Sequence, residues 1–103
     1  MRDDLSRVYS AVQACHAAIG GGQFLIPQNI PHPHLVLCKA SSEEELKQIA
    51  SRLGNEGVRH YLFVEPDLPP SNLCENGQFT ALITEPILSK ERRRLFRRYQ
   101  CVK

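Results

Sequence analysis

Long apolar runs are absent from this sequence of 103 residues. No stretch approaches the roughly 18 apolar residues that a membrane-crossing helix needs. Arg2, Asp3 and Asp4 stand where a secretory signal would place its apolar core. The sequence therefore predicts no membrane segment, and it favours a location in the cytoplasm or an equivalent reducing compartment.

Cysteine pairs with metal-binding or redox spacing are also absent. The four cysteines include no C-x-x-C pair: Cys15, Cys38, Cys74 and Cys101. Without a secretory signal, this distribution favours neither a disulfide framework nor a zinc ribbon, and we interpret the residues as buried or idle thiols. His32 and His34 precede Cys38, but their spacing matches no closed zinc site. We predict no metal centre.

The positive charge is segregated at one end of the sequence. The length and the 42% hydrophobic, 23% charged composition fit one globular domain over residues 1–103. Residues 90–103 carry a net charge of +6, whereas residues 1–89 carry −4. A basic end on an acidic body is typical of a protein that meets a polyanion, although a solvated helix with such charges is the alternative. The candidate phosphate contacts are Arg93, Arg94, Arg97 and Arg98.

Apolar residues at three- and four-residue steps predict a first helix over about residues 6–19. Its apolar stripe consists of Leu5, Val8, Ala11, Val12, Cys15 and Ile19. The glycine run at residues 20–22 is predicted to end this helix, because glycine takes the left-handed cap at little cost.

The remaining pattern predicts strands at residues 35–38, 58–64 and 79–84. A second helix follows the serine-glutamate capping pairs at residues 41–45 and stops at Gly54, and Ser89 can cap a last helix. The apolar stripe of the second helix consists of Leu46, Ile49, Ala50 and Leu53. Cys101 and Val102 could add an edge strand. Together these elements predict an α/β fold in which helices flank a small mixed β-sheet.

Gln13 and His16 lie three residues apart and therefore on neighbouring positions of one helix face. An amide can donate to a carbonyl oxygen, and an imidazole can transfer a proton near neutral pH, so the pair suits a hydrolytic site. The alternative interpretation is that both side chains only satisfy backbone groups or face solvent.

The same residues lie within a longer familiar pattern. The segment from Arg2 to Leu5, followed by Ala11-Val12-Gln13-Ala14-Cys15-His16-Ala17, resembles the R-x-D-L and A-x-Q-x-x-H-A signature of type 2 peptidyl-tRNA hydrolases. The Q-A-C-H-A-A spelling is most similar to the branch called peptidyl-tRNA hydrolase domain-containing protein. Residues 34–38, 42–46, 80–83 and 90–103 resemble later parts of that family in order, so the resemblance spans nearly the whole chain.

The resemblance implies hydrolysis of the ester between peptide and tRNA, without metal or organic cofactor. Gln13 and Thr80 match the family's glutamine and strand threonine, and His16 would support the site. Asp67 is the candidate for the family's aspartate, and Glu65 is the alternative.

Two departures from the family leave a second function open. Tyr9 stands where the family has a lysine, and the strand that runs into R-x-D-L is missing. The alternative function is therefore a catalytically impaired relative that binds tRNA or a protein. A homodimer is a further expectation, because a second chain could supply a strand.

Overall fold

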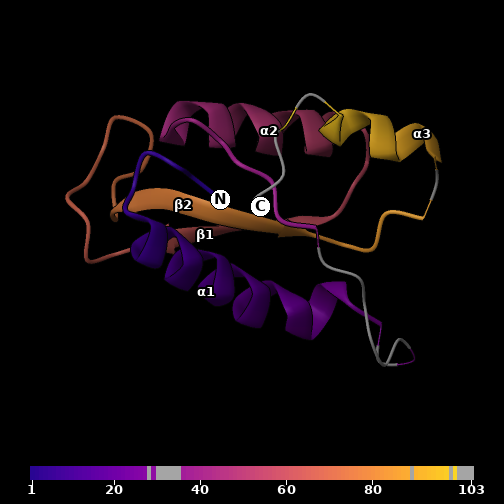
Figure 1. Ribbon diagram of the computed structural model, residues 1–103, viewed down its shortest axis with the longest axis horizontal. Helices are drawn as coiled ribbons and strands as arrows, with labels where there is room; N and C mark the ends of the chain where they lie inside the picture. The colour runs from indigo at the N-terminus through magenta and orange to yellow at the C-terminus, as the bar shows by residue number, and fades with distance from the viewer. Residues whose placement is uncertain (28, 30–35, 89, 98, 100–103) are drawn as a thin grey trace.

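The computed structural model describes residues 1–27, 29, 36–88, 90–97 and 99, with the side chain of Arg92 excepted. Two strands, β1 (His60–Glu65) and β2 (Gln78–Thr84), form an antiparallel sheet. One helix, α1 (Arg7–Leu25), packs on one face of this sheet, and a second helix, α2 (Glu43–Asn55), packs on the other (Figure 1). The predicted α/β class is therefore confirmed.

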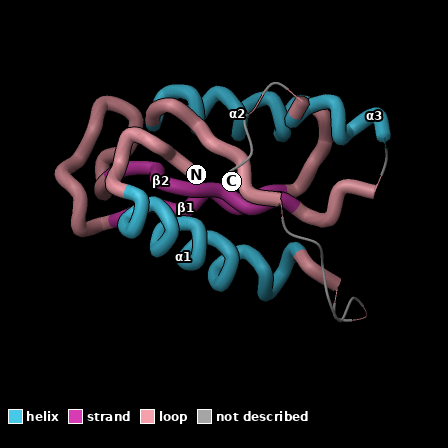
Figure 2. The backbone as a smooth tube through the Cα atoms, in the orientation of Figure 1, coloured by secondary structure: helices cyan, strands magenta, loops and turns pink. Residues whose placement is uncertain are grey.

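A short helix, α3 (Lys90–Arg93), and one 3₁₀ turn (Arg94–Phe96) follow the sheet. They lie on the same side of the sheet as α2 (Figure 2). The predicted cap Ser89 and the predicted edge strand at residues 101–102 fall outside the described residues. No helix in the described part of the chain is long and apolar enough to cross a membrane.

Capping side chains define where both long helices begin. Ser6 accepts a hydrogen bond from the backbone N–H of Tyr9, 3.3 Å away, so α1 starts where the sequence predicts. Ser42 accepts from the backbone N–H of Glu45 at 3.1 Å, and the Glu45 carboxylate accepts from the backbone N–H of Ser41 at 3.3 Å. The second of the two predicted capping registers is therefore the one that the helix uses.

The predicted end of α1 is wrong, because the helix continues through the three glycines to Leu25. A Cβ atom added at Gly20 would lie 2.8 Å from the Tyr61 ring, and one added at Gly21 would lie 2.8 Å from Tyr61 Cβ and overlap Ile83 Cγ2. The glycines therefore let the helix approach the sheet closely instead of stopping it.

The apolar stripe of α1 lies on the side of the helix away from the sheet. The buried side consists of Ser10, Gln13, Ala17, Gly21 and Leu25. Val8 and Ile19 are exposed over 77% and 67% of their surfaces. Helix α1 thus packs on the sheet through small and polar side chains, and most of its larger aliphatic side chains remain in solvent.

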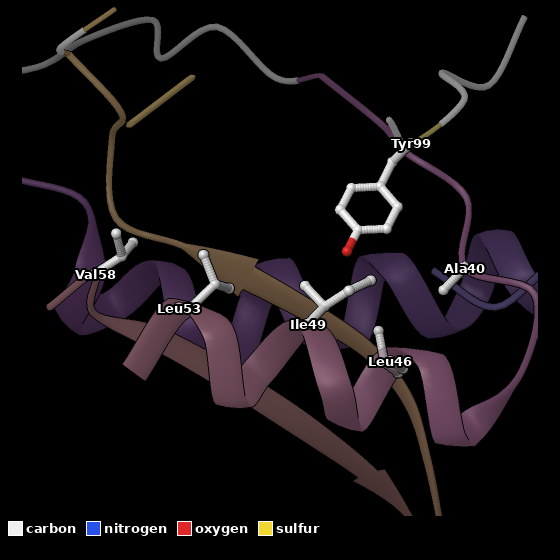
Figure 3. Packing of buried hydrophobic residues seen from close by; sticks show 6 residues of the cluster. All are labelled: Ala40, Leu46, Ile49, Leu53, Val58 and Tyr99. Atoms are coloured by element: carbon white, nitrogen blue, oxygen red, sulfur yellow. The ribbon is translucent and has the colours of Figure 1, made fainter. Parts of the chain in front are cut away.

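The main apolar core lies between the sheet and α2. Figure 3 shows its buried cluster: Ala40, Leu46, Ile49, Leu53, Val58 and Tyr99. Leu46, Ile49 and Leu53 are members of the helical stripe that the sequence predicts for α2. Because these side chains are almost fully buried, they supply much of the hydrophobic stabilisation of this half of the molecule.

Residue 35 of the predicted strand at residues 35–38 lies outside the described residues, and residues 36–38 form no named strand, although Cys38 makes an isolated bridge. Instead, Ala40 makes an isolated parallel bridge with Arg2. Ala40 N–H donates to Met1 O at 2.7 Å, and Asp3 N–H donates to Ala40 O at 2.8 Å. In the described part of the chain, the pairing of this segment therefore consists of single bridges at Cys38 and Ala40.

Candidate functional site

A polar cluster joins α1 to both strands. Thr80 Oγ1 on β2 donates to Gln13 Oε1 at 2.7 Å, and Gln13 Nε2 donates to Glu65 Oε1 at 3.1 Å. Tyr9 Oη donates to the same Glu65 oxygen at 3.3 Å. Side chains separated by more than 50 residues in the sequence therefore meet at one place between the helix and the sheet.

A β-bulge places the threonine in this cluster. Val64 pairs with Phe79 and Phe63 pairs with Ala81, so Thr80 is the additional residue on β2. Such a bulge redirects side chains relative to the regular alternation of a strand. Phe79 packs against the apolar core beside α2, whereas the hydroxyl of Thr80 reaches Gln13 on the opposite face of the sheet.

The cluster is buried at its base and reaches solvent at its carboxylate. Gln13 and Thr80 are each 0% exposed, and Glu65 is 8% exposed. Both bonds to Glu65 end on Oε1, whereas no bond within the described residues ends on Oε2, and no buried polar atom there lacks a partner. The second carboxylate oxygen therefore reaches solvent and can bind a water molecule.

Tyr9 forms the rim of this cluster. Partial burial, the charge of Glu65 and the hydrogen bond to Glu65 together raise the pKa of the Tyr9 hydroxyl above 10.0, and the charge of Asp67 adds to the effect. The phenol therefore stays protonated at neutral pH, where it serves as a neutral hydrogen-bond donor.

Glu65, the alternative candidate, is the carboxylate that contacts Gln13. Asp67 is exposed on the turn after β1 and makes no hydrogen bond to Gln13 or Thr80. The difference follows from strand geometry: Glu65 is the last residue of β1 and is held against α1, whereas Asp67 lies beyond Pro66 and outside the ladder.

His16 lies beside the cluster and outside its hydrogen bonds. Its ring stacks on Phe63 of β1, with centroids 5.1 Å apart and ring planes 13° from parallel. The side chain is exposed. The His16 ring is therefore exposed to solvent one helical turn beyond Gln13, with one face stacked on Phe63.

The basic residues lie away from the polar cluster. Arg93, Arg94 and Arg97 are exposed on α3, the 3₁₀ turn and the residue after it, whereas Arg98 lies outside the described residues. Figure 1 shows α3 on the opposite side of the sheet from α1. The structure therefore does not place these arginines at the rim of the site.

Arg2 and Ser10, which sequence reasoning did not select, hold the start of α1 against β2. Arg2 Nη1 donates to Gln78 Oε1 at 2.9 Å and to Phe79 O at 3.2 Å. Ser10 Oγ, itself buried, donates to the backbone oxygen of Arg2 at 2.7 Å. Arg2 also forms an ion pair with Asp4 at 2.6 Å. The opposite charges two residues apart in the sequence were the available signal that Arg2 has a structural role.

This ion pair predicts a small pH dependence of stability. The hydrogen bond from Arg2 lowers the pKa of Asp4 below 3.8, so the pair stabilises the fold above pH 4, and the contribution is lost as the pH falls through the lowered pKa. Asp4→Asn should therefore reduce the unfolding free energy at pH 7 by less than about 1 kcal/mol, because Asp4 is partly exposed. Urea unfolding at pH 3 and pH 7 tests this, and an equal difference at both pH values would contradict it.

Comparison of this chain with protein-family models, with curated proteins and with solved structures found no match. The family resemblance therefore stays a prediction from the sequence motifs, and any assignment of function has to be argued from the side chains described above.

Proposed function

We propose that this protein is a peptidyl-tRNA hydrolase-like enzyme that uses water to cleave the ester between a peptide and tRNA. The observation that carries the proposal is the convergence of Tyr9, Gln13, Glu65 and Thr80 from three separate elements. A phenol donor and a carboxylate open to water are groups that such a reaction requires.

In the proposed reaction Glu65 is the general base. A water molecule held by Oε2 attacks the ester carbonyl carbon while Glu65 accepts its proton. The Tyr9 hydroxyl turns from Glu65 Oε1 and donates its one hydrogen to the carbonyl oxygen as negative charge develops there. The carbon–oxygen bond to the ribose then breaks and the ribose oxygen takes up the proton held by Glu65. The peptide leaves as a carboxylate after its remaining acid proton passes to solvent.

Gln13 and Thr80 act as positioning residues in this reaction. The Gln13 amide is completely buried and bonded at both ends, since its oxygen accepts from Thr80 and its nitrogen donates to Glu65. It therefore orients the carboxylate rather than the substrate. His16, exposed one helical turn beyond Gln13, would contact the terminal nucleotide through its ring.

The finer fold assignment is part of the same proposal. A type 2 peptidyl-tRNA hydrolase-like mixed sheet without its usual first strand would need a parallel neighbour beside β2. The N-terminal residues support this, because Arg2 N–H donates to Thr80 O on β2 at 3.2 Å while Arg2 bridges Ala40 in parallel on the other side.

The runner-up function is binding of tRNA without hydrolysis. Two observations favour it: the Gln13 amide is completely buried and therefore does not reach a substrate, and Tyr9 supplies a neutral donor where the family has a cation. In this function the exposed Arg93, Arg94 and Arg97 would contact phosphates, and binding would weaken steeply with salt.

Glu65→Gln tests the enzyme directly. We expect it to lower the rate of peptide release from purified peptidyl-tRNA by about 100-fold or more, because the general base is removed. Asp67→Asn is the matched control, since this exposed carboxylate lies two residues away, and it should change the rate by less than about twofold. Thermal melts show whether both variants are folded.

The outcomes separate the two functions. If the wild-type protein releases peptide no faster than the uncatalysed reaction, the enzyme proposal fails. Salt-sensitive gel shifts with tRNA would then support the binding module. If Asp67→Asn abolishes release while Glu65→Gln does not, the assignment of the general base is wrong.

A further inference from the structure

A large apolar cavity lies along the free edge of β2. Its volume is about 1110 Å³. Helix α2 lines one side of it through Leu46 and Ile49, and α1 lines the other side through small residues: Ala11, Ala14, Cys15 and Ala18. Because α1 and α2 cover opposite faces of the sheet (Figure 1), the cavity lies in the layer that a further strand of the sheet would occupy.

The free edge of β2 presents backbone groups to this cavity. Glu85 N–H donates to Arg59 O at 2.9 Å, so the backbone groups of Glu85 face the β1 side. Backbone groups alternate between the two edges of a strand, so those of Leu82 and Thr84 face the cavity, which both residues line. No hydrogen bond between described residues reaches these outward N–H and C=O groups. An unpaired edge of this kind is a template for another strand.

The first three residues of the chain already pair as a strand at one end of the cavity. Ala40 N–H donates to Met1 O at 2.7 Å, and Asp3 N–H donates to Ala40 O at 2.8 Å. On the other side, Arg2 N–H donates to Thr80 O on β2 at 3.2 Å. Met1 itself lines the cavity. An extended chain in the cavity would therefore lie in line with a strand pairing that is already present.

We propose that this cavity binds an extended segment of a partner polypeptide, which adds a strand to the free edge of β2. A lipid chain would fill the apolar space but would leave the outward groups of Leu82 and Thr84 unpaired, whereas a peptide backbone satisfies them. Both described strands belong to the chain's own sheet, so a second copy has no described strand to donate. The proposal does not rest on the proposed hydrolysis, because no residue of the polar cluster lines the cavity.

The walls of the cavity define the chemistry of the partner segment. A strand here is covered by α1 on one face and α2 on the other, and strands covered on both faces are continuous apolar runs. The edge from Ala81 to Glu85 has room for a run of about five residues. Among the described lining residues the cations are Lys39 and Arg93, and the one acid, Glu85, accepts from the backbone N–H of Arg59 at 2.5 Å. The partner should therefore carry acidic residues beside its apolar run.

Fluorescence anisotropy with a synthetic peptide tests the proposal. The probe has a run of alternating valine and isoleucine, about five residues long, with glutamates at both ends and a fluorescein label. It should bind with a dissociation constant on the order of 1–100 µM. The same peptide with its apolar residues N-methylated keeps its side chains but loses its N–H donors, so it should bind at least about tenfold more weakly.

Two variants of α1 test the location of the bound peptide. Ala14→Phe places a ring in the cavity and should weaken binding at least about tenfold, because the ring and the peptide compete for the same space. Val8→Phe is the matched control, since Val8 is 77% exposed on the same helix and does not line the cavity. It should change the dissociation constant by less than about twofold. Thermal melts show whether both variants are folded.

Amide hydrogen exchange of the wild-type protein gives a measurement that needs no variant. Bound peptide should slow exchange at Leu82 and Thr84 at least about tenfold, because their N–H groups gain acceptors. Ala81 and Ile83 face β1 and already belong to the ladder, so their exchange should change much less.

Three outcomes would overturn the partner strand. The first is equal binding of the N-methylated peptide, since the cavity would then take apolar groups without strand pairing. The second is unchanged exchange at Leu82 and Thr84 in the complex. The third is no binding of the probe at protein concentrations up to about 300 µM, including the case in which sedimentation velocity shows a dimer whose second copy covers the edge.

Discussion

Gly21→Ala should lower the melting temperature by more than about 12 °C, whereas Gly22→Ala, one residue later in the same helix, should raise it by about 4 °C. At Gly21 a new Cβ would overlap Ile83 Cγ2 and lie 2.8 Å from Tyr61 Cβ, atoms that belong to the sheet itself. Overpacking of this kind costs about 3 kcal/mol, and each kcal/mol shifts the melting temperature of a domain of this size by about 4–8 °C.

Gly22 is the matched control because the same added methyl group meets only Ile26 Cδ1, 3.8 Å away. The alanine there stabilises the helix by about 0.5–1 kcal/mol through its higher helix propensity and its smaller loss of chain entropy. Differential scanning calorimetry of the two variants measures both effects. Equal melting temperatures would show that α1 does not contact the sheet at Gly21 as the structure has it.

This close approach explains why the end of α1 could not be predicted. Three consecutive glycines are a strong signal for a helix end when only local propensity is considered. The tertiary contact reverses it, because side chains larger than hydrogen would separate the helix from Tyr61 and Ile83. A stripe of small residues at Ser10, Ala17 and Gly21 was the available signal for a helix packed closely on a sheet.

The buried face of α1 illustrates a second limit of periodicity. Two stripes with helical spacing run along this helix, and the rule that large apolar residues lie inside selects Val8, Val12 and Ile19. The structure buries the other stripe, which contains Gln13. For α2, where only one stripe is apolar, the same rule predicts the buried residues Leu46, Ile49 and Leu53 correctly.

Some residues of the candidate site could be predicted from the sequence, and others could not. Gln13 and Thr80 were selected through the family resemblance, and the structure brings them within 2.7 Å of each other. The choice between Asp67 and Glu65 needed the register of the sheet, because only pairing of β1 with β2 holds Glu65 at the edge of α1. The bulge at Thr80 left no visible signal, since no glycine or proline marks it.

The hydrogen bond between Gln13 and Thr80 leads to the second large effect. Gln13→Leu should destabilise the fold by about 2–4 kcal/mol, because it leaves the Thr80 hydroxyl buried without an acceptor and removes a donor from Glu65. Thr80→Val should cost about 1–2 kcal/mol, because the Gln13 oxygen then lacks its donor. Urea unfolding of both single variants and of the double variant gives the coupling between them.

The double variant should be about as stable as Gln13→Leu alone. Gln13→Leu leaves the Thr80 hydroxyl without an acceptor, and Thr80→Val removes that hydroxyl. Strictly additive losses would contradict a direct bond between the two side chains.

Kinetics then separate a positioning role from a purely structural one. With Oε1 of Glu65 released from Gln13, the folded double variant should lose at least tenfold in kcat with little change in KM, because the base is misaligned while the surface that binds tRNA is intact. A folded double variant with wild-type kcat would show that the amide and hydroxyl only fill the space between helix and sheet.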